Sequence, residues 1–194
     1  MEEKMSLSSL TLQELQQRIA DYEDEVSYKK LFFHFFLPLK SFSFSIIKSK
    51  ELAEEIVSDI LIDIWAKRKQ LAGIDNLKMY LYVSVRNASL RKMQQTKKSV
   101  MLSLDEVNVE FASSYENAET ILLTRELSEK IDLAIQQLPQ RCKLIFKLAK
   151  EDRLKYKEIA VLLNISVKTI DHQVSLALKK IAEVLHISLK KPFS

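Results

Sequence analysis

Turn-forming residues are nearly absent from this chain. Its 194 residues include one glycine and three prolines, whereas a strand-rich fold needs many tight turns. Hydrophobic residues make up 47% of the chain, enough for ordinary cores, and a chain of this length holds one large or two small domains. The sequence therefore predicts an all-α protein.

The segment from 155 to 181 has the pattern of two short amphipathic helices joined by a sharp turn. Ile159, Ala160 and Leu163 share one face of the first helix. Asn164 stands in the turn, where a left-handed backbone is expected and asparagine tolerates it well. Ser166 is expected to cap the second helix, which repeats apolar residues at helical spacing: Ile170, Val174, Ala177, Leu178 and Ile181. The pattern is typical of a DNA-reading helix-turn-helix, although a polar helical hairpin has the same apolar periodicity.

Polar side chains remain on the outer face of this motif, and positive charge is concentrated around it. From residue 124 to the end there are 14 lysines and arginines against 8 acidic residues, whereas residues 1–95 carry 14 against 13. Phosphate neutralisation would require this distribution, which favours DNA binding over a simple hairpin. The side chains predicted to contact bases or phosphates in a major groove are Lys155, Ser166, Lys168, Thr169, His172, Gln173 and Lys179.

Nothing in the sequence indicates export or membrane insertion. Cys142 is the single cysteine, so no internal disulfide is possible, and the acidic start of the chain does not resemble a secretory signal. The longest apolar tract, residues 31–47, is broken by His34, Pro38 and Lys40, which argues against a membrane span. We therefore expect a cytoplasmic, soluble protein.

Residues suited to catalysis form no recognisable pattern. His34, His172 and His186 are far apart in the sequence and have no metal-ligand spacing, and Gly73 alone cannot build a phosphate-binding loop. We therefore expect no enzyme activity, no catalytic residue, no metal, no cofactor and no small-molecule substrate.

The first half of the chain is predicted to contain four helical segments. An acidic amphipathic helix is expected over 10–30, followed by an aromatic segment that Pro38 should interrupt or restart. A third helix should begin at Ser49 and run to Trp65, with one acidic side, and a fourth should span residues 77–95. Residues 97–118 lose helical periodicity and become acidic, which predicts a flexible linker between two domains, 1–96 and 119–194.

The order of these segments resembles that of the extracytoplasmic-function sigma factors, small two-domain members of the bacterial sigma-70 family. The resemblance lies in LAEEIVSDILIDIWAKR (52–68), NLKMYLYVSVRNASLRK (76–92) and the terminal motif, and it extends over residues 25–186. The strings at 138–142, 155–160 and 164–169 are similar to those of members from Bacteroides and its relatives. Three motifs in this order across two domains are a specific signal.

The resemblance implies a factor that binds core RNA polymerase, recognises promoter DNA and captures the melted strand, with an anti-sigma protein as a further partner. The terminal motif would read the upstream promoter element. Polymerase would dock on an acidic helix face with its terminal tryptophan: Glu51, Glu54, Glu55, Asp59, Asp63 and Trp65. The downstream element and melted strand would contact the fourth helix and the loop before it: Asn76, Lys78, Tyr80, Tyr82, Arg86, Asn87 and Arg91. Helical periodicity places Tyr80 and Tyr82 on different faces, so one of them should be exposed.

Two other functions fit parts of the sequence. The first is a freestanding helix-turn-helix repressor or activator with an N-terminal partner-binding bundle. The second is a helical adaptor for protein interactions, which would leave the basic recognition face unexplained. A repressor would bind duplex DNA alone, whereas a sigma factor of this kind should need polymerase.

Overall fold

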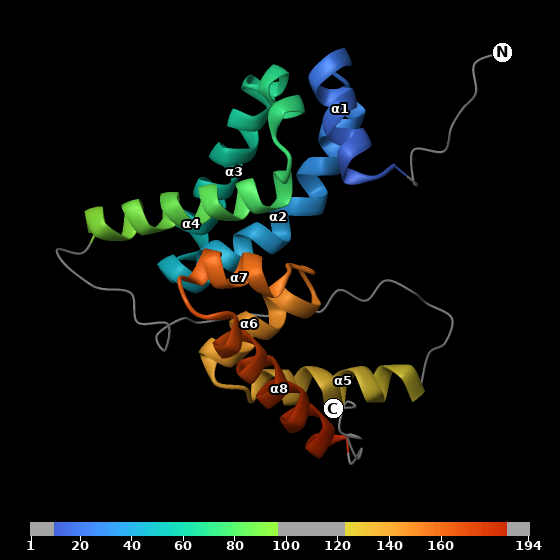
Figure 1. Ribbon diagram of the computed structural model, residues 1–194, viewed down its shortest axis with the longest axis vertical. Coiled ribbons are helices and arrows are strands. Elements are labelled where there is room, and N and C mark those ends of the chain that lie inside the picture. Colours follow the sequence, from blue (N-terminus) through green and yellow to red (C-terminus); the bar gives the residue numbers. More distant parts are fainter. Residues whose placement is uncertain (1–9, 97–122, 186–194) are drawn as a thin grey trace.

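The computed structural model describes residues 10–96 and 123–185, and the regular structure in these ranges is entirely helical, as the sequence predicts (Figure 1). The elements follow one another as α1 (Leu12–Tyr22), α2 (Glu25–Ile47), α3 (Lys50–Ala66), the 3-10 helix η2 (Arg68–Gly73), α4 (Leu77–Thr96), α5 (Leu123–Gln136), α6 (Gln140–Lys150), α7 (Tyr156–Leu163) and α8 (Val167–Val184). The predicted linker, 97–118, lies outside the described residues.

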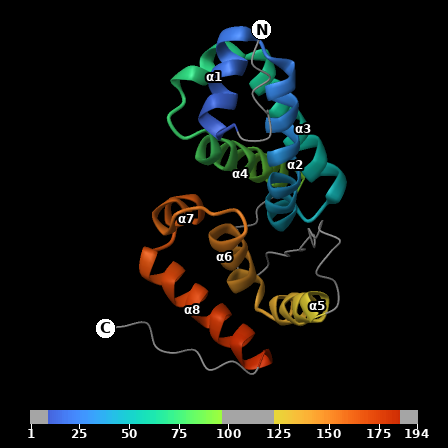
Figure 2. The same ribbon diagram turned by 90° about the vertical axis from the view of Figure 1, so that its right-hand side faces the viewer.

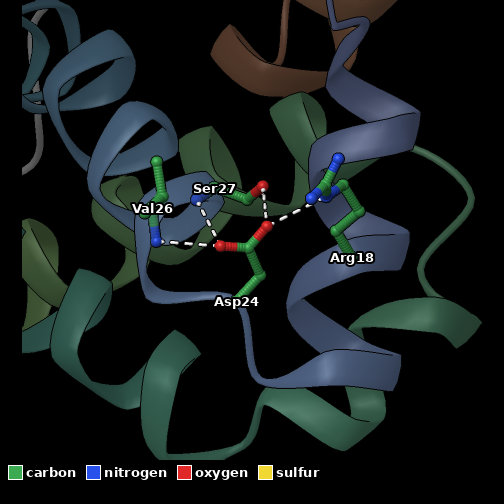
Figure 3. Close-up of polar contacts among 4 residues, drawn as sticks. All are labelled: Arg18, Asp24, Val26 and Ser27. Carbon is green, nitrogen blue, oxygen red and sulfur yellow. Dashed lines mark hydrogen bonds and ion pairs between the residues drawn. The ribbon is translucent and has the colours of Figure 1, made fainter. Parts of the chain in front are cut away.

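The single helix expected over 10–30 is wrong, because the chain breaks between α1 and α2. Glu23 adopts a left-handed backbone with φ of 53°, which ends α1. Asp24 then caps α2: its Oδ1 accepts hydrogen bonds from the Val26 and Ser27 amides, and its Oδ2 pairs with Arg18 Nε at 2.9 Å (Figure 3). The cap satisfies amide groups that a new helix leaves unpaired, so the break is stable.

Helix α2 continues through Pro38, so the predicted interruption is also wrong. Phe35 and Leu39, on either side of the proline, are buried at 2% and 0% exposure. Tertiary packing of this apolar stripe overrides the local cost of a missing amide donor. By length and composition alone α2 would suffice to cross a membrane, even though it contains His34, Pro38 and Lys40. Such a helix is weak evidence for a span, since core helices of soluble proteins have the same composition.

Helices α1, α3 and α4 pack around α2. Ser43 of α2 and Ser89 of α4 share a buried hydrogen bond of 2.8 Å. Gln16 of α1 donates to the backbone carbonyls of Leu71 and Ile74, which holds η2 against α1. The position of η2 in turn sets where α4 begins.

The two groups of helices, α1–α4 and α5–α8, meet where α7 lies beside α4 (Figures 1 and 2). One apolar cluster joins buried residues of both groups, among them Leu77 and Tyr82 on α4, Leu154 just before α7 and Ile159 on α7. A second, smaller cluster lies between α5, α6 and α8. The expected division at 97–118 therefore stays a prediction, with a packed contact between the halves on either side of it.

We expect Asp24→Ala to lower the free energy of unfolding by about 1–2 kcal/mol, because the change removes the N-cap of α2. Asp24→Asn keeps the oxygen that caps the Val26 and Ser27 amides and loses the acceptor that Oδ2 offers to Arg18 and to the Ser27 hydroxyl, so its loss of stability should be smaller than that of alanine. Urea denaturation of both variants measures the difference. Equal stability of Asp24→Ala and the unaltered chain would contradict a capping role.

Candidate DNA and polymerase interfaces

Helices α7 and α8 form the predicted helix-turn-helix. Asn164 ends α7 with φ of 53° and ψ of 50°, the left-handed conformation expected for it. The Ile165 amide donates to the Ala160 carbonyl at 3.0 Å, which closes the turn. Ser166 Oγ accepts from the Thr169 amide at 3.0 Å and caps α8, so the predicted cap is confirmed.

The inner face of the motif differs from the prediction at two positions. Leu162 is buried at 1% exposure, whereas Leu163 is only partly buried. Leu178, expected inside, is 38% exposed. Which side chains face inward near the end of α7 and on α8 depends on how α6 packs against these helices. Helical periodicity alone does not determine that packing.

The outer face of α8 is a stripe of exposed polar residues, which we call the reading face: Lys168, Asp171, His172, Ser175 and Lys179. Their spacing of three or four residues places them on one side of the helix. Asp171 and Ser175 are not among the predicted contacts, although the same spacing counted from Lys168 along the sequence points to both. Donors, acceptors and a carboxylate on one helix face match the groups that base edges present in a major groove.

Of the other residues predicted to contact the upstream element, Ser166, Thr169 and Gln173 take part in contacts within the domain. Thr169 is half-buried, and its hydroxyl shares a 2.8 Å hydrogen bond with that of Ser166, so both side chains take part in the cap. Gln173 is half-buried, and its backbone carbonyl accepts from Cys142 Sγ at 3.2 Å, which ties α8 to α6. Lys155 is exposed at the start of α7. The predicted set therefore divides into side chains that shape the motif and side chains that face outward.

On α3 the five predicted acidic residues, which we call the acidic stripe, are all exposed: Glu51, Glu54, Glu55, Asp59 and Asp63. Three of them form ion pairs: Glu54 with Lys40, Glu55 with Lys92 at 3.1 Å, and Asp63 with Lys67 at 2.7 Å. Within the described residues no ion pair is recorded for Asp59, so this carboxylate is available to a basic partner.

Trp65 lies half-buried at the end of the acidic stripe and forms one wall of a pocket. Its ring centroid lies 4.8 Å from that of Tyr28, and the Arg68 guanidinium lies 5.0 Å from the tryptophan ring. The pocket of about 420 Å³ is also lined by residues of the first turns of α2, including Val26, which is 52% exposed. The sequence carried no signal for this pocket, because its lining comes from two separate helices.

Helix α4 presents its predicted contacts on opposite sides. Tyr80 is 43% exposed and Tyr82 is 1% exposed, as the periodicity argument requires. The ring of Tyr82 packs against Phe42 of α2 with centroids 5.2 Å apart. Asn87 and Arg91 are exposed, Arg86 is half-buried, and Asn76 and Lys78 are hydrogen-bonded to the α6–α7 region. The structure therefore does not bring all seven residues to one open surface.

Burial changes the pKa values of two groups, Asp152 and Tyr82, that lie where the two halves of the chain meet. Burial raises the pKa of Asp152 above its ordinary value, an effect that Lys147 and the Tyr82 hydroxyl oppose. Burial likewise raises the pKa of Tyr82. Among the described residues no cluster of histidines, cysteines and carboxylates is placed to hold a metal ion.

Comparison with known proteins assigns the C-terminal helices. Residues 128–181 match the family model described as sigma-70, region 4. The chain therefore carries a sigma-70 region 4 domain, a helix-turn-helix DNA-binding domain, formed by the described parts of α5–α8. Among solved structures, the chain is similar to the sigma factor RpoE from Bartonella quintana in complex with the anti-sigma factor NepR. The identity is 21%, 84% of this chain and 98% of that chain are covered, and the TM-score is 0.49. No curated protein matches the chain.

We expect Asn164→Ala to destabilise the helix-turn-helix by about 1 kcal/mol, because alanine carries a Cβ into a left-handed backbone without a polar side chain to compensate. Asn164→Gly should lie within about 0.5 kcal/mol of the unaltered chain, since glycine adopts this conformation freely. Thermal unfolding followed by circular dichroism tests both variants. Equal losses from alanine and glycine would show that the asparagine side chain, not its backbone, stabilises the turn.

Proposed function

We propose that this protein is a sigma factor that binds core RNA polymerase and directs initiation at a specific set of promoters. The observation that carries the proposal is the exposed reading face of α8 within a domain that matches sigma-70 region 4. A helix of this kind reads the upstream promoter element through base edges in the major groove. The members of the sigma-70 family that the sequence resembles are the extracytoplasmic-function factors, in particular those from Bacteroides.

Docking on polymerase is assigned to the acidic stripe together with Trp65. A row of exposed carboxylates suits a basic partner surface, and the adjacent pocket offers an apolar anchor point beside the charges. Complementary charge speeds association and favours the correct partner, while a buried aromatic anchor contributes more of the affinity. The open carboxylate of Asp59 at the middle of the stripe supports this assignment.

Strand capture is assigned to α4 and the loop before it. Tyr80 offers an exposed ring for stacking, and Arg86, Asn87 and Arg91 offer donors along the same helix. Aromatic stacking and positive charge are the usual means of holding unpaired bases. Asn76, Lys78 and Tyr82 belong to the same predicted set, although they are engaged with the C-terminal half in this structure.

The proposed protein acts in the cytoplasm, where polymerase and promoter DNA are found. An anti-sigma protein is a further proposed partner, which follows from the resemblance in sequence. The proposal includes no enzyme activity and no small-molecule substrate.

In vitro transcription on genomic fragments is the experiment that tests the proposal. With core polymerase and the full chain, we expect transcripts from a small set of fragments and none with core polymerase alone. A repressor or activator would instead bind its duplex without polymerase and would not confer initiation on the core enzyme. Specific duplex binding by the free chain, without any transcript, would overturn the sigma-factor proposal.

We expect Asp59→Lys to weaken polymerase binding by at least about tenfold, equivalent to about 1.4 kcal/mol, because it places a positive charge against a basic partner surface. Helix α3 should remain folded, since the introduced lysine would face Glu55 and Asp63 four residues away on either side. Asp21→Lys makes the same charge change at an exposed position of α1 and is the control. Pull-down or biolayer interferometry measures the affinity of each variant for core polymerase. Undiminished binding by Asp59→Lys would show that the acidic stripe is not part of the interface.

We expect His172→Ala and Gln173→Ala to relax base preference at single positions of the upstream element, each by about 1–3 kcal/mol. Lys179→Ala should instead lower the affinity for all DNA sequences by the same factor and reduce the salt dependence of binding, because a phosphate contact carries no sequence information. Holoenzyme binding to a library randomised over the upstream element measures both effects. Gln173 is half-buried, whereas His172 is exposed. If Gln173→Ala alone keeps the base preference of the unaltered chain, base recognition belongs to the exposed residues of α8 and not to Gln173.

A further inference from the structure

One exposed carboxylate lies among the basic and hydroxyl side chains of the reading face. Asp171 follows Lys168 by three residues and precedes Ser175 by four, so the three side chains lie on the same exposed side of α8. A surface that binds only phosphates has no use for a carboxylate, because an acidic group repels the DNA backbone. The presence of Asp171 on this face therefore points to a role other than phosphate binding.

The structural roles of an aspartate near a helix N-terminus do not apply to Asp171. The cap of α8 is the Ser166 hydroxyl, which accepts from the Thr169 amide at 3.0 Å. Asp171 lies beyond the first turn, to which the attraction between a carboxylate and the helix dipole is largely confined. Glu183, the other exposed carboxylate of α8, lies 4.0 Å from Lys179, whereas no ion pair is recorded for Asp171 among the described residues. The carboxylate of Asp171 is thus available to accept from a ligand.

The beginning of α7 lies within electrostatic range of Asp171. Tyr156, the first residue of α7, is half-buried, and its pKa is raised by burial and, to a smaller extent, by the charge of Asp171. Lys155 and Lys157 are exposed on either side of this tyrosine. Phosphate contacts from these lysines would fix the orientation of the motif on a duplex, which leaves Asp171 to meet base edges.

A carboxylate in a major groove distinguishes cytosine from the other bases. It accepts hydrogen bonds and donates none, and the N4 amino group of cytosine is a donor. Guanine presents N7 and O6 and thymine presents O4, all of which are acceptors that repel a carboxylate. Adenine is intermediate, because its N6 donor lies beside the N7 acceptor. A carboxylate therefore selects cytosine both by attraction and by repulsion of the competing bases.

We propose that Asp171 is a specificity-determining residue of the reading face, which selects a cytosine in the upstream promoter element by accepting from its N4 amino group. The assignment rests on the proposed function, because it takes α8 to be the helix that enters the major groove at the promoter. Lys168, one turn earlier on the same face, is suited to guanine O6 and N7. Side chains at this spacing have Cβ atoms about 5–6 Å apart, so the guanine and the cytosine should lie within about two base pairs of each other.

The same carboxylate lowers the affinity of α8 for DNA in general. It places a negative charge near the phosphates that Lys155, Lys168 and Lys179 attract. Removal of the charge should therefore raise the affinity for unrelated sequences while it lowers discrimination at one position. A residue that only stabilised the fold would not produce these opposite changes, because a loss of folded protein lowers binding to every sequence.

Asp171→Asn and Asp171→Ala are the variants that test the proposal, and Asp21→Asn is the matched control. Asparagine has nearly the same shape as aspartate, and its amide both donates and accepts, which suits N7 and N6 of adenine. Alanine removes the hydrogen-bonding group altogether. Asp21→Asn makes the same change of charge at an exposed position of α1, in the other half of the chain. Thermal unfolding verifies that each variant is folded.

The base preference is measured by selection from a duplex library randomised over the upstream element, followed by sequencing of the bound DNA. Each variant is used as the full chain, once with core polymerase and once alone. We expect the unaltered chain and Asp21→Asn to select cytosine at one position by about tenfold over guanine and thymine. Asp171→Asn should select adenine at that position, and Asp171→Ala should show no preference there. Lys168→Ala should lose the preference for a neighbouring guanine.

The affinity for unrelated DNA is measured by anisotropy with a fluorescein-labelled duplex whose sequence the selection does not enrich. Asp171→Asn and Asp171→Ala should both bind this duplex more tightly than the unaltered chain, whereas Asp21→Asn should bind it equally. An unaltered preference at every position in Asp171→Asn overturns the proposal. A uniform loss of binding to all sequences also overturns it, because that result indicates a structural role.

The result for Asp171 is distinguishable from the result for the sigma-factor proposal. Enrichment that requires core polymerase supports a sigma factor, and the variants then decide the role of Asp171. Enrichment by the chain alone, without transcripts in the presence of core polymerase, overturns the sigma-factor proposal and still tests Asp171 on the enriched element. If the unaltered chain enriches no sequence in either sample, both proposals are overturned.

Discussion

The structure depends on the burial of α4 on two sides. Its Leu77, Leu81 and Val85 lie in the core formed with α2 and α3, and its Tyr82 lies in the part of the same cluster that reaches the C-terminal half. A helix that is apolar on more than one side is stable only when it is covered on more than one side. The position of α4 therefore determines how the N-terminal bundle packs, and it also determines where α7 packs (Figure 2).

The exposed faces of the molecule are separated by chemistry. The acidic stripe lies on α3, and the reading face, with two lysines and a histidine, lies on α8. Helix α8 packs against α5, α6 and α7, so its reading face can be turned toward DNA without disturbing the N-terminal core. A protein that must hold a basic partner with one part and phosphate with another benefits from this separation, because each surface repels the other's ligand.

The sequence by itself determined the helical class, the position of the helix-turn-helix, the Ser166 cap, the left-handed Asn164 and the exposed acidic side of α3. These features depend on neighbours within a few residues, which is the range that propensity, capping and periodicity describe. Only the tertiary structure decided that α2 runs through Pro38, that the chain breaks at Glu23 and Asp24, and that Leu178 faces outward. It also decided that Asn76, Lys78 and Tyr82 face the other half of the chain, because Glu158 lies 82 positions from Asn76 and no local pattern relates two such residues.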